Sequence, residues 1–363
     1  MKATTVGSAM IDTIAIISSD RIERMLMVNA DKSFLLMEEG KKTDAEAIST
    51  HLGGGGVNTA VCLSRLGFAT AALVKLGRDE RAENILAGFA REGVSAQWAR
   101  RTEKLPTGAS VILSSHTRNA GIFTYRGANT TLEKTDIDPA AFAADLVHVC
   151  SLSHPSTARF PEIVGLAKKN KAQVSANPGP RQIAARAGEL LGALSSIDIL
   201  FINRNEAEAL TAALAPRFGE GGPSIAKKGE EAPDFVKRGL AGGAFAMSLA
   251  RFVTALAELG LKTLVITDGG RGSFVASAGA LFHCPIVRTT VAGTAGAGDA
   301  FGSTFAAWRA LGRPLEEAAI AASHNAAGVV EHVDTQTGLK TRAALEATVA
   351  ASALSGEIRA WAL

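Results

Sequence analysis

Short apolar runs alternate with amphipathic stretches over most of the chain. The runs typical of buried strands are Thr4–Val6, Ala71–Lys75, Leu146–Cys150, Gln173–Ala176, Ile199–Ile202 and Thr263–Thr267. Between them lie Ala- and Leu-rich segments with helical spacing, among them Asn84–Arg91, Ile163–Lys171, Ala184–Leu194 and Glu206–Ala213. Strands that alternate with helices favour an α/β fold, with a mostly parallel, doubly wound sheet and helices on both of its faces.

Two regions depart from this rhythm because their apolar and polar residues alternate one by one. Ile11–Ile17 and Ala47–Leu52 form one such pair, and Gly108–Leu113 and Ile122–Tyr125 form the other, joined by the loop Ser115–Gly121. The alternation predicts antiparallel strands of a small β lid over a cleft. A third irregular stretch, Pro216–Gly243, reads as an exposed excursion that leads into a helix around Ala244–Leu259.

Composition and charge exclude several classes of protein. With 38 basic and 35 acidic residues among 363, the net charge is only +3, and no basic run interleaved with aromatics appears. We therefore expect no nucleic-acid partner. The most membrane-like stretch, Gly239–Leu259, contains Arg251 and Glu258, so a buried helix is the better interpretation and no membrane partner is expected. The three cysteines are scattered in apolar surroundings, which favours reduced thiols and a cytoplasmic location.

The strongest chemical signal is the loop Gly293–Phe301, which reads GTAGAGDAF and precedes an apolar helix. Small residues let the backbone approach a ligand, and a helix N-terminus presents free N–H groups to an anion. Asp299 at this place suits a base that takes a proton from a hydroxyl about to attack a phosphate. Two alternatives remain: a glycine-rich turn capped by an aspartate, and a dinucleotide-binding fingerprint, although this loop comes late in the chain for the latter.

A second cluster, Gly53–Asn58, reads GGGGVN and leads into the next helical segment. Four glycines remove side chains where the backbone must touch a neighbour, and the Asn58 carboxamide offers both donors and acceptors. The combination suits a polyhydroxylated ligand. A flexible turn is the alternative interpretation.

With these two clusters in place, the chain resembles the ribokinase-like carbohydrate kinases of the PfkB family from about residue 4 to residue 340. Further marks of that family follow in order along the chain. They are Gly7-Ser8 with Asp12, Gly77-x-Asp79, Gly127-Ala128-Asn129, Asn203-x-x-Glu206 and Thr267-x-Gly269-x-x-Gly272. The resemblance implies one ribokinase-like domain over residues 1–363, with lid segments inserted at about 11–52 and 108–127.

The resemblance also implies roles for individual residues. Asp299 would be the catalytic base, and the backbone of Gly296, Ala297 and Gly298 would form an anion hole for the transferred phosphoryl group. The acceptor substrate would be held by Asp12, Gly54, Gly55 and Asn58. The nucleotide side would comprise Thr267, Gly269, Gly272, Asn325 and the pair Asn203 and Glu206.

Glu206 would order Mg²⁺, with water between the carboxylate and the ion. The alternative for this pair is structural, namely a strand-end Asn203 and a Glu in the first turn of a helix. Gly293 stands where many relatives carry an Asp that helps to hold a monovalent cation, so weak or absent dependence on K⁺ is expected.

These features favour an ATP- and Mg²⁺-dependent kinase that phosphorylates a primary hydroxyl of a sugar. A nucleoside kinase of the adenosine type and a non-catalytic sugar- or nucleotide-binding relative are the alternatives. A homodimer formed through the lid is a further arrangement that the sequence leaves open. The acceptor is not identified, because its selection would depend on side chains such as Phe34, Phe123, Tyr125 and Arg126, with His154 and Asn177 as weaker candidates near strand ends.

Overall fold

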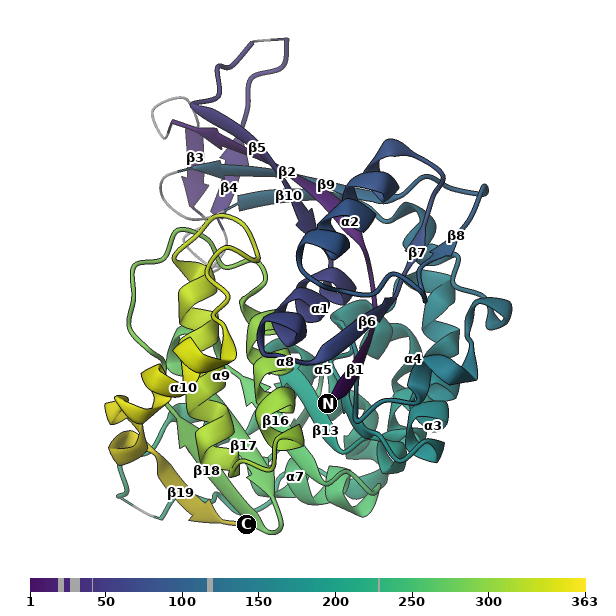
Figure 1. Cartoon of the computed structure of the whole chain (residues 1–363). Helices are drawn as coiled ribbons and strands as arrows, with labels where there is room; N and C mark the ends of the chain where they lie inside the picture. Colours follow the sequence, from purple (N-terminus) through teal and green to yellow (C-terminus); the bar gives the residue numbers. More distant parts are fainter. Residues whose placement is uncertain (19–22, 27–32, 41, 116–119, 228) are drawn as a thin grey trace.

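The computed structural model of the chain describes residues 1–18, 23–26, 33–40, 42–115, 120–227 and 229–363. Within these residues the central sheet has nine strands in the order β19-β18-β17-β16-β13-β12-β11-β1-β6 (Figure 1). In chain order they are β1 (Lys2–Val6), β6 (Ala69–Leu73), β11 (Leu146–Val149), β12 (Gln173–Ala176), β13 (Ile199–Asn203), β16 (Thr263–Thr267), β17 (Ser273–Ser277), β18 (Ala280–Cys284) and β19 (Arg359–Ala362).

Most of this sheet is parallel, as the apolar runs predict. Strands β6, β1, β11, β12, β13 and β16 pair in parallel. The remaining edge is antiparallel, because β17, β18 and β19 each reverse direction against the preceding strand. The sequence analysis did not predict this edge, although Ala278 and Gly279 between β17 and β18 both have positive φ, as in a two-residue hairpin turn.

Helices cover both faces of the sheet, which confirms the doubly wound fold. One core contains residues of α1 (Gly55–Arg65), α2 (Glu80–Arg91), α8 (Ala297–Ala310), α9 (Leu315–Val330) and α10 (Arg342–Ala350). The other contains residues of α3 (Phe160–Lys169), α4 (Pro180–Gly192), α5 (Arg204–Phe218), α6 (Asp234–Arg238) and α7 (Leu249–Glu258). Successive residues of β13 alternate between the two, because Leu200 lies in one core and Phe201 in the other.

A separate sheet with the order β10-β9-β2-β5 projects from the main body at the top of Figure 1. Its strands are β2 (Met10–Ile17), β5 (Ala47–Gly53), β9 (Gly108–Ser115) and β10 (Ala120–Tyr125). Strand β2 pairs antiparallel with β5, and β9 pairs antiparallel with β10, so both predicted pairs are confirmed. Residues 116–119 of the predicted hairpin loop lie outside the described residues. That this small sheet closes over a substrate as a lid stays a prediction.

The excursion predicted over Pro216–Gly243 is more regular than expected. Pro216 lies inside the last turn of α5, and residues 240–247 form the hairpin of β14 (Leu240–Gly242) and β15 (Phe245–Met247). The helix predicted from Ala244 was therefore wrong at its start, since α7 begins only at Leu249. Ser248 caps it, because its Oγ accepts a hydrogen bond from the Arg251 N–H at 3.2 Å.

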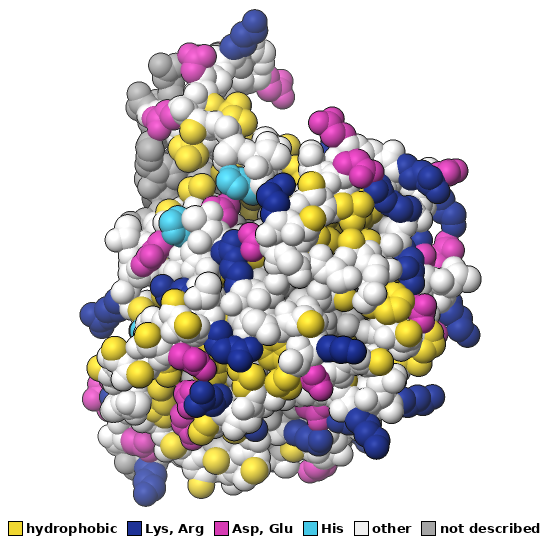
Figure 2. Space-filling model, in the orientation of Figure 1, with side chains coloured by type: hydrophobic (Ala, Val, Ile, Leu, Met, Phe, Trp, Pro, Cys, Tyr) yellow, Lys and Arg dark blue, Asp and Glu magenta, His cyan; other side chains and the backbone are white. Residues whose placement is uncertain are grey.

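Other general predictions concern the surface and the cysteines. In the part of the chain that the structure describes, no helix combines the length and the apolar character needed to cross a membrane. Acidic and basic side chains are interspersed over the face shown in Figure 2. All three cysteines are buried with free thiols, as predicted.

Candidate active site

The N-terminus of α8 is the centre of the candidate site. Gly296 is its N-cap with φ +77°, and a Cβ there would lie 2.6 Å from the Cβ of Thr335, so only glycine fits. The first bond within the helix runs from Ala300 N to Gly296 O, which leaves the amides of Ala297 and Gly298 without a helical partner. A Cβ on Gly298 would meet no atom within 4 Å. Open space therefore lies beside free N–H groups, as an anion hole requires.

Asp299 follows these amides and faces the glycine-rich start of α1. Its Oδ2 accepts a hydrogen bond from Nδ2 of Asn58 at 2.8 Å. A Cβ on Gly55 would lie 3.4 Å from the Asp299 Oδ1, so the loop approaches the carboxylate closely. Burial raises the pKa of Asp299 and the charge of Asp12 adds to this effect, whereas the Asn58 hydrogen bond opposes it. A carboxylate of raised pKa is a better proton acceptor than an ordinary aspartate.

Asp12 is the second carboxylate of the site and lies on β2. Its Oδ1 accepts a hydrogen bond from Ser110 Oγ on the neighbouring strand β9 at 2.5 Å. A Cβ on Gly53 would lie 1.8 Å from the Asp12 Oδ2, and Gly54 has φ +92°. The glycines of this loop are therefore required by close packing as well as by backbone conformation. Burial raises the pKa of Asp12 more than Ser110 and His51 lower it.

Asn58, which the sequence analysis predicts to contact substrate, is held by hydrogen bonds at both ends of its carboxamide. While Nδ2 donates to Asp299, its Oδ1 accepts hydrogen bonds from Thr335 Oγ1 at 2.8 Å and from Gln336 Nε2 at 3.1 Å. Two donors on the oxygen fix the orientation of the amide, so the NH₂ group must face the Asp299 carboxylate. Asn58 thus holds this carboxylate in place, and its contact with substrate stays a prediction.

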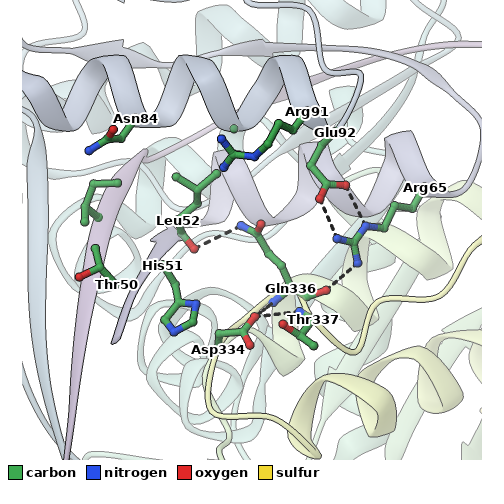
Figure 3. A pocket seen from close by; sticks show the side chains of 12 residues that line it. Thr50, His51, Leu52, Arg65, Asn84, Arg91, Glu92, Asp334, Gln336 and Thr337 are labelled. Atoms are coloured by element: carbon green, nitrogen blue, oxygen red, sulfur yellow. Dashed lines mark hydrogen bonds and ion pairs between the residues drawn. The ribbon is translucent and has the colours of Figure 1, made fainter. Parts of the chain in front are cut away.

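Thr335 and Gln336 were missed by the sequence analysis. Gln336 Nε2 also donates to Leu52 O at 3.2 Å (Figure 3). This segment therefore links the small sheet to Asn58 and, through Asn58, to Asp299. Arg65 secures the segment by donating to Gln336 O while pairing with Glu92, beside a polar cavity of ≈ 380 Å³. No local pattern could have revealed the link, because Asn58 and Thr335 lie 277 residues apart.

A second cavity, of ≈ 440 Å³, lies on the other side of the α8 N-terminus. Thr267, Gly269 and Gly272 line it together with Ala297 and Gly298, so the structure brings the predicted nucleotide loop to the predicted anion hole. Much of its remaining lining is apolar, as a slot for a flat base requires. These residues are Ile286, Val287, Val291, Phe301, Ala326, Ala327 and Val330.

Asn203 and Glu206 lie beside this loop, since Asn203 pairs in register with Thr267. They form a reciprocal cap of α5, in which Asn203 Oδ1 accepts from Glu206 N at 2.9 Å and Glu206 Oε2 accepts from Asn203 N at 2.8 Å. The structural alternative is therefore realised, and it does not exclude a role toward a cation. Glu206 is only 5% exposed, and burial raises its pKa to about 7.

Asn325, which is predicted to lie beside the adenine, is not among the residues that line the second cavity. Its side chain is fully buried, donates from Nδ2 to Thr304 Oγ1 at 2.8 Å, and accepts from Lys340 N at 2.9 Å. Cavity-lining positions on α9 are spaced i, i+3, i+4 and i+7, and residue 325 falls on another face of the helix. These positions are Ser323, Ala326, Ala327 and Val330.

Phe123 and Tyr125, two of the side chains predicted to select the acceptor, project from the face of the small sheet opposite to Asp12. Asp12, Ser110 and Thr124 occupy one register position across β2, β9 and β10, and therefore share one face of the small sheet. Phe123 and Tyr125 flank Thr124 on β10 and project from the opposite face, where they are 66% and 49% exposed. Nothing is described of the Phe34 side chain. Among the weaker candidates, Asn177 links strands, because its Nδ2 donates to Phe201 O at 2.9 Å.

Comparison with known proteins agrees with this geometry. The family model described as pfkB family carbohydrate kinase matches residues 15–342. A bifunctional ribokinase/ribose-5-phosphate isomerase A of Fructilactobacillus sanfranciscensis is 29% identical over 325 residues, which cover 87% of this chain and 54% of the relative. The chain thus spans about half the length of that protein.

Solved structures show the same fold. Ribokinase from Thermotoga maritima superposes with a TM-score of 0.72 at 22% identity, covering 96% of this chain and 99% of the other. A nucleoside kinase from Methanocaldococcus jannaschii reaches 0.73 at 19% identity, covering 97% and 99%. Because the family match extends from the small sheet to the segment that holds Asn58 in place, the chain belongs to the pfkB family of carbohydrate kinases.

Proposed function

We propose that the protein transfers the γ-phosphoryl group of ATP to a primary hydroxyl of a sugar, with Asp299 as general base. The observation that carries the proposal is the position of this carboxylate. It stands one residue beyond two free amides that face open space, between a cavity suited to a nucleotide and the Asp12 carboxylate.

The chemistry follows from these positions. Asp12 accepts hydrogen bonds from acceptor hydroxyls and orients the acceptor, because a carboxylate has several acceptor sites. Asp299 takes the proton of the attacking hydroxyl as the new oxygen–phosphorus bond forms. The amides of Ala297 and Gly298 stabilise the negative charge on the transferred group, and ADP leaves from the apolar cavity. Phosphoryl transfer needs little beyond such positioning and electrostatic stabilisation.

The residues present also fit a magnesium ion. Glu206 is a buried carboxylate beside the nucleotide loop, and burial raises its pKa, so a nearby cation would favour its charged form. Oxygen ligands of this kind are those that Mg²⁺ prefers. Glu206, with Asn203 beside it, would hold the hydrated ion, which supplies charge neutralisation of the phosphates.

A screen for acceptor-dependent ADP release tests the proposal. Pentoses, hexoses, sugar acids, sugar phosphates and nucleosides would each be supplied with Mg·ATP. The product formed from any compound that causes ADP release would be identified by mass spectrometry. A phosphorylated sugar supports the proposal. Release only with nucleosides would favour the nucleoside kinase, and binding of sugar without ADP release would favour the non-catalytic relative.

A further inference from the structure

Arg126, at the end of β10 in the small sheet, and Arg181, in the first turn of α4, have no acidic partner among the described residues. Arg126 directly follows β10 and is half-buried, and its Nη1 donates to Ser153 Oγ at 3.1 Å. Arg181 is the second residue of α4. The mechanism proposed above uses neither side chain.

Arg126 is tied to the acceptor side of the site. Its carbonyl oxygen accepts a hydrogen bond from Asn129 Nδ2 at 2.9 Å, and Asn129 Oδ1 accepts from Ala9 N at 2.8 Å, just before the strand that carries Asp12. Ser153 lies three residues beyond Cys150, and a Cβ on Gly55 would be 3.0 Å from the Cys150 Cβ. The Arg126 guanidinium therefore lies beside the strand end that also borders the glycine loop.

Arg181 belongs to the first turn of α4, which packs on the same short segment. Its neighbour Gln182 accepts a hydrogen bond from Leu152 N through Oε1 at 3.3 Å. Gly179, immediately before α4, packs so closely on Ser151 that a Cβ there would be 2.3 Å from its Oγ. Arg126 and the first turn of α4, which carries Arg181, thus both border residues 151–153. Burial, and then the positive charge of Arg181, lower the pKa of Arg126.

Arg126 is half-buried whereas Arg181 is exposed, and the placement of each has an electrostatic cost. A half-buried guanidinium without a counter-ion loses hydration, and two cations close together repel each other. Arg181 also stands in the first turn of a helix, where the positive end of the helix dipole disfavours a cation. His154, the residue after Ser153, has φ 30°, a left-handed conformation that is rare without glycine and that gathers at functional sites. A bound anion would relieve the three electrostatic penalties at once.

We propose that Arg126 and Arg181 bind an anionic group of the acceptor, a carboxylate or a phosphate, at the end of the molecule remote from the hydroxyl that is phosphorylated. Guanidinium groups suit this task because they are planar and can donate two parallel hydrogen bonds to the oxygens of a carboxylate or a phosphate. This inference rests on the proposed function and narrows its substrate class to acidic sugars.

The experiment compares acidic and neutral acceptors in the wild type and in Arg126→Gln and Arg181→Gln. Sugar acids and sugar monophosphates are paired with uncharged sugars of the same chain length, and the two anionic sets identify the source of the charge. In the wild type we expect kcat/KM to be at least tenfold higher for one anionic set than for its neutral partners. Each variant should raise KM for that acceptor at least tenfold, raise KM for the neutral partners by a much smaller factor, and leave KM for ATP unchanged.

Arg186→Gln is the matched control, because Arg186 lies on the same helix and pairs with Glu189 on the surface. If the wild type has an equal or higher kcat/KM for neutral sugars, the inference is overturned and the kinase proposal is unaffected. The inference is also overturned if Arg126→Gln and Arg181→Gln have the same KM for the anionic acceptor as Arg186→Gln. If no acceptor releases ADP, the proposed function fails, and calorimetric titration of both anionic sets still decides the inference. Binding that both variants weaken tenfold supports it, and an absence of binding refutes it.

Discussion

Replacing Glu206 by Gln separates what this side chain contributes to the fold from what it contributes to the nucleotide site. Gln keeps the shape and can still accept the hydrogen bond from Asn203 N, as the second member of a capping box does. It cannot carry the negative charge. The substitution therefore removes a buried charge and leaves the helix cap in place.

The size of the effect follows from the pKa of Glu206, which burial raises from 4.5 to about 7. Between these values the folded protein binds more protons than the unfolded chain, so folding stability falls as the pH rises through this window. A difference of about 2.5 pKa units corresponds to about 3 kcal/mol. Glu206→Gln should therefore be no more stable than the wild type below pH 4.5, and more stable by up to about 3 kcal/mol above pH 7.

Urea unfolding of the protein without nucleotide, at intervals from pH 4.5 to pH 8.5, measures this directly. Glu208→Gln is the control, since Glu208 lies on the same helix in a surface ion pair with Arg204, and should change stability by less than about 1 kcal/mol. In parallel, the KM for Mg·ATP should rise in Glu206→Gln and not in Glu208→Gln. A Glu206→Gln protein that is destabilised at pH 8, or whose stability relative to the wild type does not vary with pH, would refute the reasoning.

Three further substitutions test neighbouring parts of the site. Asp12→Ala should weaken acceptor affinity by roughly 10- to 150-fold, because each hydrogen bond to a charged group contributes about 1.5–3 kcal/mol; calorimetry should show unchanged ATP affinity, and an equal loss for both ligands would indicate a misfolded small sheet. Asn58→Leu removes the donor that opposes the raised pKa of Asp299, so the acid limb of kcat/KM should move to higher pH; an unmoved limb would contradict the positioning role. Gly293 offers a cation only backbone groups, so rates in K⁺ and in tetramethylammonium at matched ionic strength should agree; a tenfold activation by K⁺ would show that other groups build a cation site.

The sheet could be predicted as far as its strands are buried on both faces. Continuous apolar runs such as Ile199–Ile202 identify such strands without any knowledge of their neighbours. The antiparallel edge is different. Strand β19 pairs with β18 through Trp361 and Leu281, so its place depends on a contact between distant parts of the chain.

The site likewise contains residues that the local sequence identifies and contacts that depend on distant parts of the chain. Gly298, Asp299 and Asp12 could be found because their residue types and positions next to a helix or strand carry the chemistry locally. The contacts of Asn58 could not, since its partners come from the far end of the chain. That Asn325 does not line the cavity could have been inferred from the sequence, because helical spacing separates it from Ala326 and Ala327, which do.

The most direct test of the account is the rate of phosphoryl transfer by the Asp299→Asn variant. The substitution keeps the size and hydrogen-bonding capacity of the side chain and removes the base. With an acceptor that the wild type phosphorylates, kcat should fall by roughly 10²–10⁴ on the scale of general-base catalysis, while calorimetry shows unchanged affinity for ATP. A folded Asp299→Asn protein that phosphorylates this acceptor at a near-normal rate would contradict the assignment of Asp299 as the base.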